Sequence, residues 1–195
     1  MEQIFVGGNQ EYLNLLFYRF FDEFQLGHLL LAVGIFCGTY LLLSGVQRRL
    51  GCSDGTRRIR FRSCAGAGLL VYLYLVVLYA IVFRPVNEFP RHAKLFWSYR
   101  LALDGYGYMW IEIVLNYIFL LPVGVIVPLF LRRHVLAVTI GVGFVISLTI
   151  EVVQLISCRG LFEFDDIIGN VLGVIVGYGV HCLPTLIGII SENKN

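Results

Sequence analysis

Charged residues are scarce in this chain, and that scarcity decides its class. Only 14% of the 195 residues are Asp, Glu, Lys or Arg, whereas 58% are hydrophobic. Soluble domains carry about a quarter of their residues as charges, so an ordinary soluble fold is excluded. The chain also lacks a Pro- or Ser-rich linker, a charged tail and a low-complexity block. These absences favour one integral membrane domain.

Motifs of soluble catalysis and of metal binding are missing as well. The sequence has no Walker A loop, no Gly-x-Ser-x-Gly and no Ser, His and Asp order typical of a hydrolase. Its five cysteines form no Cys-x-x-Cys pair, and its four histidines lack metal-ligand spacing. We expect no cofactor and no metal, although four carboxylates have the chemistry of hard-cation ligands: Glu112, Glu151, Asp165 and Asp166.

Long apolar runs are what the chain does have. Five of them can cross a hydrocarbon core of about 30 Å, which takes about 20 helical residues. They lie at 26–46, 65–83, 113–130, 135–156 and 167–190. Before them, apolar residues at helical spacing over 13–24 predict an amphipathic helix that lies on the bilayer surface or caps the bundle. The predicted fold is an all-α integral membrane bundle of about five transmembrane helices with an N-terminal amphipathic interfacial helix.

Basic residues are distributed unevenly between the two ends of these spans. Nine fall on the side that we assign to the cytoplasm, six of them within 47–64 and two at Arg132 and Arg133, against six on the other side. The positive-inside rule predicts a multi-pass plasma membrane protein with its N-terminus outside and its C-terminus cytoplasmic. Beside a membrane, lipid headgroups are the expected partner of an arginine cluster, and nucleic acid is not expected.

Polar residues interrupt three of the runs at one depth, the outer end in this orientation. Buried carboxylates and amides are costly in hydrocarbon, so they have partners and often a function. Singly, each is equally well explained as interhelical glue, and Asp166 as a helix cap. Together they favour an outward-facing hydrated pocket. The candidate binding residues are Glu112, Asn116, Glu151, Gln154, Arg159, Asp165, Asp166 and Asn170.

The loop between the fourth and fifth spans is short, so these helices must be antiparallel neighbours. Arg159 is then held close to Glu163, Asp165 and Asp166, where a guanidinium forms charge-assisted pairs with carboxylates. We therefore expect an Arg159–carboxylate network beside Glu151.

Small residues and prolines predict how the helices pack. Glycines four residues apart let helix backbones approach closely. Proline removes a backbone donor, so a kink is expected at 121–124 in the third span. The residues concerned are Gly34 and Gly38 in the first span, Gly169, Gly173 and Gly177 in the fifth, and Pro122 and Pro128 in the third.

Many of these residues stand in an order that resembles the VanZ family of membrane proteins. The resemblance implies a small multi-helix integral protein, some of whose relatives give resistance to glycopeptide antibiotics, teicoplanin in particular. It implies no established reaction. Residues 66–195 would form a VanZ-like four-helix domain, and residues 1–65 would add the amphipathic helix, the first span and a basic cytoplasmic loop. The matching positions are Asn116, Pro122, Gly124, Glu151, Gln154, Arg159, Asp166, Asn170 and Gly173.

The leading hypothesis is a non-enzymatic membrane protein whose outer pocket binds a cell-wall precursor or an amphiphilic antibiotic and so reduces glycopeptide action. The alternative is a membrane enzyme that modifies a lipid or a lipid-linked cell-wall precursor. Its catalytic candidates are Glu151 as general base and Asp166 orienting Gln154 or water, with Arg159 holding an anionic headgroup. A transporter is disfavoured because no inverted repeat is found, and a purely structural scaffold is the third class.

Cysteine-accessibility mapping tests the orientation. With the native cysteines replaced, Asp104→Cys is expected to react with a membrane-impermeant maleimide in intact cells. Arg57→Cys is expected to react only after the membrane is opened, because its loop is assigned to the cytoplasm. The reverse labelling pattern would place the polar residues at the cytoplasmic side and remove the geometric basis of a wall-related role.

Overall fold

The computed structural model describes residues 26–49, 56–84, 86, 91–92 and 94–192. Five of its helices are long and apolar enough to cross a membrane: Gly27–Arg49, Thr56–Val82, Tyr108–Phe130, Val135–Ser157 and Phe164–Pro184. The predicted all-α membrane fold with five spans is therefore confirmed. The amphipathic helix predicted at 13–24 lies outside the described residues and stays a prediction.

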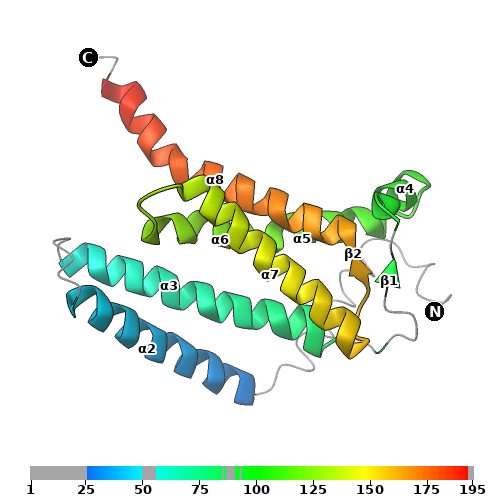
Figure 1. Ribbon diagram of the computed structural model, residues 1–195, viewed down its shortest axis with the longest axis horizontal. Coiled ribbons are helices and arrows are strands. Elements are labelled where there is room, and N and C mark those ends of the chain that lie inside the picture. The colour runs from blue at the N-terminus through cyan, green and yellow to red at the C-terminus, as the bar shows by residue number, and fades with distance from the viewer. Residues whose placement is uncertain (1–25, 50–55, 85, 87–90, 93, 193–195) are drawn as a thin grey trace.

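The spans run side by side, and short elements gather at one end of them (Figure 1). The helices are α2, Leu26–Arg49; α3, Thr56–Val77, continued by the π-helix η2, Leu78–Val82; α4, Trp97–Leu103; α5, Tyr108–Phe119; α6, Leu121–Ile126, continued by the 3₁₀ helix η3, Val127–Phe130; α7, Val135–Ser157; and α8, Phe164–Glu192. Two short strands, β1 at Arg91–His92 and β2 at Phe162–Glu163, pair in parallel.

Helix α8 lies at the centre of the bundle. It packs along α5, α6 and α7, whereas α2 packs mainly against α3. On α8, Val174 is fully buried in a core with Leu69, Leu120 and Val123. Because α2 has one main neighbour, apolar side chains such as Leu30 remain exposed, as expected of a surface that faces lipid.

The third span is interrupted where its prolines lie. Helix α5 ends at Phe119 and α6 begins at Leu121, with Leu120 between them at φ −108° and ψ 7°. Pro122 and Pro128 stand in the first turns of α6 and η3, where a missing backbone donor has no consequence. The interruption lies at Leu120, directly before the range 121–124 near which the kink was predicted.

Glycines on α8 permit the close approach of the third span. A Cβ added at Gly173 would overlap the carbonyl oxygen of Tyr117, and one added at Gly177 would overlap that of Leu121. From the facing helix, a Cβ at Gly124 would overlap the backbone of α8 at Val174. The predicted packing role of the α8 glycines is confirmed, because a larger residue does not fit at this crossing.

The glycines of α2 behave differently. Among the described residues, nothing lies within 4 Å of a Cβ added at Gly34 or Gly38. The prediction that this pair brings helices together is wrong for the helices that the structure describes. The physical reason is that Gly34 and Gly38 lie on an exposed face of α2, while α3 covers another face.

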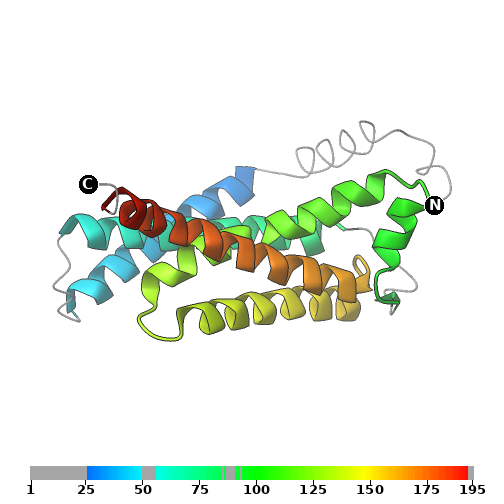
Figure 2. The same ribbon diagram turned by 90° about the horizontal axis from the view of Figure 1, so that it is seen from above.

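Helix α4 crosses the end of the bundle instead of continuing a span. Figure 2 shows its axis running across the direction of the long helices, at the end where β1 and β2 also lie. Helix α4 therefore belongs to the short elements at this end of the spans and is not part of a span.

Substitution of a glycine at the α8 crossing is expected to be far more damaging than substitution on α2. Gly173→Ala places a methyl group against the Tyr117 carbonyl, and such overpacking lowers the free energy of unfolding by about 1–3 kcal/mol. Gly34→Ala is the matched control, because its methyl group has open space and alanine favours a helix over glycine by about 1 kcal/mol. Thermal unfolding in detergent measures both. Equal melting temperatures for the two variants would contradict the described crossing.

Candidate functional site

Polar side chains from four segments meet at one end of the bundle: the end of η2, the start of α5, the end of α7 and the start of α8. Only residues 158–163 connect α7 to α8, so the ends of these two helices are adjacent. All eight predicted binding residues lie toward this end. They divide into a buried layer that joins the helices and an outer group that lines two cavities.

Glu151, a catalytic candidate from the sequence, belongs to the buried layer. Only 2% of its surface is exposed. Its Oε2 accepts a 2.8 Å hydrogen bond from the backbone N–H of Glu163, which joins α7 to β2. Glu151 lines neither of the two cavities described below, so in this arrangement it is not placed to act as a base on a ligand there.

Two further side chains near the end of α7 satisfy carbonyl groups at the end of η2. The last carbonyls of a helix have no intrahelical donor. Gln154 Nε2 donates to the carbonyl of Ala80 at 2.8 Å. Arg159 Nη1 donates to the carbonyls of Val82 at 2.6 Å and Arg84 at 3.4 Å. Together they fix the position at which the second span ends.

The structure corrects the predicted role of Arg159. Its guanidinium binds backbone carbonyls, and the expected network with Glu163, Asp165 and Asp166 is wrong. The physical reason is that the end of η2 carries free carbonyls and the negative end of a helix dipole, which attract a cation. The three carboxylates have other donors.

Asn170 also joins two helices. Its Nδ2 donates to the Oγ of Ser147 at 2.9 Å, and both residues are buried between α7 and α8. Such bonds are typical glue in membrane bundles. Within the described part of the chain, the side-chain oxygens of Asn170 and Gln154 are buried without a hydrogen-bond donor. Asn170 therefore belongs to the buried layer.

Asp165 holds the start of α4 in place. Its Oδ1 accepts from the backbone N–H of Phe96 at 2.6 Å, and its Oδ2 accepts from that of Ser98 at 3.2 Å. The free amides at a helix start favour a carboxylate. Phe96 adopts a left-handed conformation, with φ 58°. Asp165 thus caps a helix about seventy residues earlier in the chain and fixes α4 across the site.

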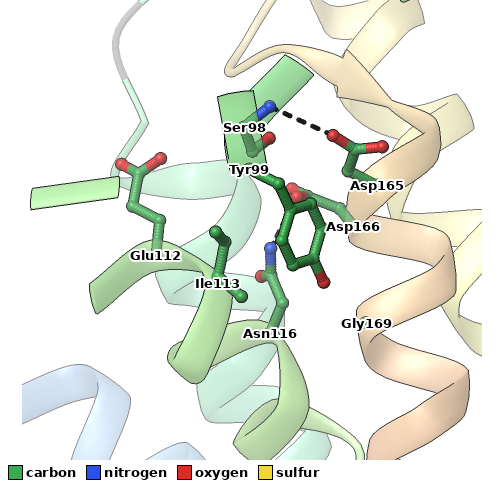
Figure 3. Close-up of a pocket in the computed structure, with 8 residues that line it drawn as sticks. All are labelled: Ser98, Tyr99, Glu112, Ile113, Asn116, Asp165, Asp166 and Gly169. Atoms are coloured by element: carbon green, nitrogen blue, oxygen red, sulfur yellow. Dashed lines mark hydrogen bonds between the residues drawn. The ribbon is translucent and has the colours of Figure 1, made fainter. Parts of the chain in front are cut away.

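The outer group surrounds Asp166. Its Oδ1 accepts a 2.5 Å hydrogen bond from Asn116 Nδ2, which joins α8 to α5. With Glu112, these two residues line both cavities. Figure 3 shows the ring of Tyr99 between α5 and α8, beside Asn116 and Asp166. Four members of the predicted set therefore line open space: these three, which line both cavities, and Asp165, which lines the narrower one.

Five residues at this site were not predicted from the sequence. Ser98 and Tyr99 line one cavity, and Tyr79 and Arg84 line the other. The fifth is Trp97, whose Nε1 donates to Glu163 Oε2 at 3.0 Å. Arg84 had a usable signal, because it directly follows the second span at the depth of the other polar residues. The residues of α4 had no such signal, because their segment is too short and too mixed in polarity to be recognised as a span.

Comparison with known proteins identifies the family. A family model described as VanZ/LLP1 matches residues 70–186. The chain belongs to the VanZ/LLP1 family. The resemblance inferred from the sequence is thus confirmed, and the VanZ/LLP1 match contains the buried layer and both cavities while α2 precedes it. Searches of curated proteins and of solved structures found no match.

In this VanZ/LLP1 protein, Glu163 lies between two spans in an acidic surrounding. Burial raises the pKa of Glu163 to about 9, and the negative charges of Asp166, Glu112 and Glu151 act in the same direction. The hydrogen bond from Trp97 opposes them. Glu163 is therefore protonated at neutral pH, which reduces the negative charge beside the cavities.

Tyr99, on α4, is also held in its protonated form. Burial raises the pKa of its phenol, and its hydrogen bond with Tyr117 adds to this effect. The two hydroxyl oxygens lie 3.1 Å apart.

Within the described residues, no three histidine, cysteine or acidic side chains are arranged to hold a metal ion.

Glu163→Gln is expected to change how stability depends on pH. The unfolded carboxyl group ionises above about pH 4.5, whereas the folded one keeps its proton to about pH 9. Between these values the folded state binds more protons, so the stability of the wild type falls as pH rises. Glutamine cannot ionise, and it keeps an oxygen that accepts from Trp97. The melting temperature of the variant relative to wild type should therefore increase from about pH 5 to about pH 9.

The control for this measurement is Asp104→Asn, since Asp104 is exposed in the turn after α4. Its melting temperature relative to wild type should show no comparable trend. A difference between Glu163→Gln and wild type that stays constant with pH would contradict the protonation assigned to Glu163.

Proposed function

We propose that this VanZ/LLP1 membrane protein acts at the cell envelope through an outward-facing polar pocket that binds an amphiphile. The amphiphile is a lipid-linked wall component or an amphiphilic antibiotic, and binding lowers susceptibility to glycopeptides such as teicoplanin. The observation that carries the proposal is the pair of cavities that share Glu112, Asn116 and Asp166.

The direction of the helices supports an outward-facing pocket. Helix α3 begins beside Arg57 and leads to the cavities at its other end, and α7 begins just after Arg133 and ends at the same site. The basic residues of the predicted 47–64 loop lie in the last turn of α2 and the first turns of α3, at the opposite end of the spans from the cavities. Under the positive-inside rule, this basic end is cytoplasmic and the cavities face the exterior.

The lining of the cavities supports an amphiphilic ligand. Charged and amide groups from Arg84, Glu112 and Asn116 share the wider cavity with the apolar side chains of Leu115 and Phe119. A pocket that combines apolar walls with a few convergent polar groups is typical of a small-molecule site. A pocket at the outer end of the spans is at the level of the lipid headgroups, which supports this class of ligand.

Expression in a susceptible Gram-positive host tests the proposal. At matched protein levels, the wild type is expected to lower teicoplanin susceptibility, and Glu112→Gln and Asp166→Asn are expected to return it toward that of cells with an empty vector. The reason is that each variant removes a charge from both cavities. The measurement is the minimum inhibitory concentration.

The matched control is Arg100→Gln, because Arg100 is exposed on α4 and lines neither cavity. This variant should behave as wild type. Equal teicoplanin susceptibility with and without the wild-type protein would count against the proposed function.

A further inference from the structure

The wider cavity has walls of both charge signs. It covers about 380 Å³ of non-protein space including open solvent, against about 260 Å³ for the narrower cavity. Arg84 supplies a cation, and Glu112 and Asp166 supply carboxylates on the same lining. Arg84 and Asp166 are close enough for their charges to interact. A ligand in this cavity meets positive and negative groups together.

The lining also changes from polar to apolar along the helices. On α5, Phe119 lies about 10 Å deeper than Glu112, at about 1.5 Å per residue. On the facing wall, Tyr79 precedes Arg84 and lies deeper in the span. The rings of Tyr79 and Phe119 meet edge to face, with centroids 5.5 Å apart. An amphiphile whose headgroup lies at the end of the spans is also polar at that end and apolar deeper in the membrane, so it matches the lining.

We propose that this cavity binds the headgroup of a phospholipid that carries a primary ammonium beside its phosphate, as phosphatidylethanolamine does. Arg84 holds the phosphate, Glu112 and Asp166 hold the ammonium, and the acyl chains pass the apolar side of the cavity at Phe119. The assignment goes beyond the proposed function, because a phospholipid is neither a lipid-linked wall component nor an antibiotic; the two proposals share only the pocket.

The arrangement of opposite charges, and not their sum, favours a zwitterion. A net anion is attracted by Arg84 but repelled by two carboxylates, and a net cation is attracted by the carboxylates but leaves Arg84 without a ligand group of opposite charge, whereas a zwitterion offers an opposite charge to both. If a zwitterion separates an existing ion pair in the cavity, its own two charges supply a new partner to each member of that pair. Arg84 and Glu112 can therefore have partners before the ligand binds. A primary ammonium also donates three hydrogen bonds to oxygen acceptors, which a quaternary ammonium cannot do.

The surface around the cavity fits the lipid headgroup region. Helix α4 lies across this end of the bundle (Figure 2). Leu95, Phe96 and Leu103 on and beside α4 are 47%, 49% and 76% exposed, and Lys94 and Arg100 are exposed among them. Exposed apolar and basic side chains together are typical of an element that lies at a membrane interface. Helix α4 lines the narrower cavity, which shares Glu112, Asn116 and Asp166 with the wider one, so the wider cavity is at the same end of the spans and at the level of the headgroups.

Selective lipid retention tests the assignment. The full-length protein is reconstituted in vesicles of equal parts phosphatidylethanolamine, phosphatidylcholine and phosphatidylglycerol, extracted in mild detergent, and its retained lipid is measured by mass spectrometry. Phosphatidylethanolamine is expected to be enriched about tenfold over the other two, the factor that one charge-assisted hydrogen bond of about 1.4 kcal/mol supplies. Equal retention of the three lipids, or enrichment of phosphatidylglycerol, would overturn the proposal.

Two substitutions test separately the contact to the ammonium and the contact to the phosphate of the headgroup. Glu112→Gln should abolish the preference for phosphatidylethanolamine over phosphatidylcholine, because one ammonium acceptor loses its charge. Arg84→Gln should lower retention of phosphatidylethanolamine by weakening the phosphate contact. Arg100→Gln should leave retention unchanged. Melting temperatures in detergent confirm that each variant is folded, and a folded Glu112→Gln that keeps the full preference would overturn the assigned site.

A soluble competitor distinguishes the source of the headgroup. Glycerophosphoethanolamine should not displace the retained lipid at concentrations equal to that of phosphatidylethanolamine, since it lacks acyl chains. Displacement at equal concentration would overturn the lipid as the ligand. Unselective lipid retention together with teicoplanin protection would overturn this inference alone. Selective retention without teicoplanin protection would overturn the proposed function and leave the lipid assignment supported.

Discussion

The site depends on one constraint, that backbone groups at helix ends within a membrane protein must find partners. Three side chains near the end of α7 supply hydrogen-bond partners for backbone groups of other segments. Glu151 accepts from the backbone of β2, while Gln154 and Arg159 donate to carbonyls at the end of η2. Leaving a buried donor or acceptor unpaired costs about 1–3 kcal/mol, so none of these segments can shift alone. Their positions determine where Arg84 and Glu163 stand beside the cavity.

This constraint explains why Glu151, the carboxylate that lies deepest in an apolar run of the sequence, does not line a cavity. A carboxylate deep in an apolar run predicts either a function or a partner, and Glu151 has a backbone partner. Asp166 and Asn116 bond to each other and still line both cavities with Glu112. Arg159, beyond the end of α7, binds carbonyls, whereas Asn116, inside α5, faces open space. Open space beside a side chain, and not its depth along the helix, therefore separates the residues that line the cavities from those that join the helices.

The sequence predicted the spans, the kink in the third span and the common depth of the polar residues. Each of these follows from position along the chain, since bilayer thickness fixes span length and proline removes a donor at a known place. Direction around a helix axis and choice among partners do not follow in this way. Gly34 faces open space, Arg159 binds carbonyls, and Asp165 caps α4 across a long sequence separation. These outcomes depend on which elements pack together, and a single sequence does not supply that.

The buried layer also sets the electrostatic character of the cavity. If Glu163 were ionised, the wider cavity would hold three carboxylates against the single cation Arg84, and a neutral headgroup would enter a strongly negative space. Burial and the surrounding acidic groups instead keep Glu163 protonated at neutral pH. The remaining charges of Glu112, Asp166 and Arg84 are then closer to balance. A ligand that carries one charge of each sign leaves the net charge of the cavity unchanged and offers an opposite charge to Arg84 and to the carboxylates, whereas a net anion makes the cavity more negative.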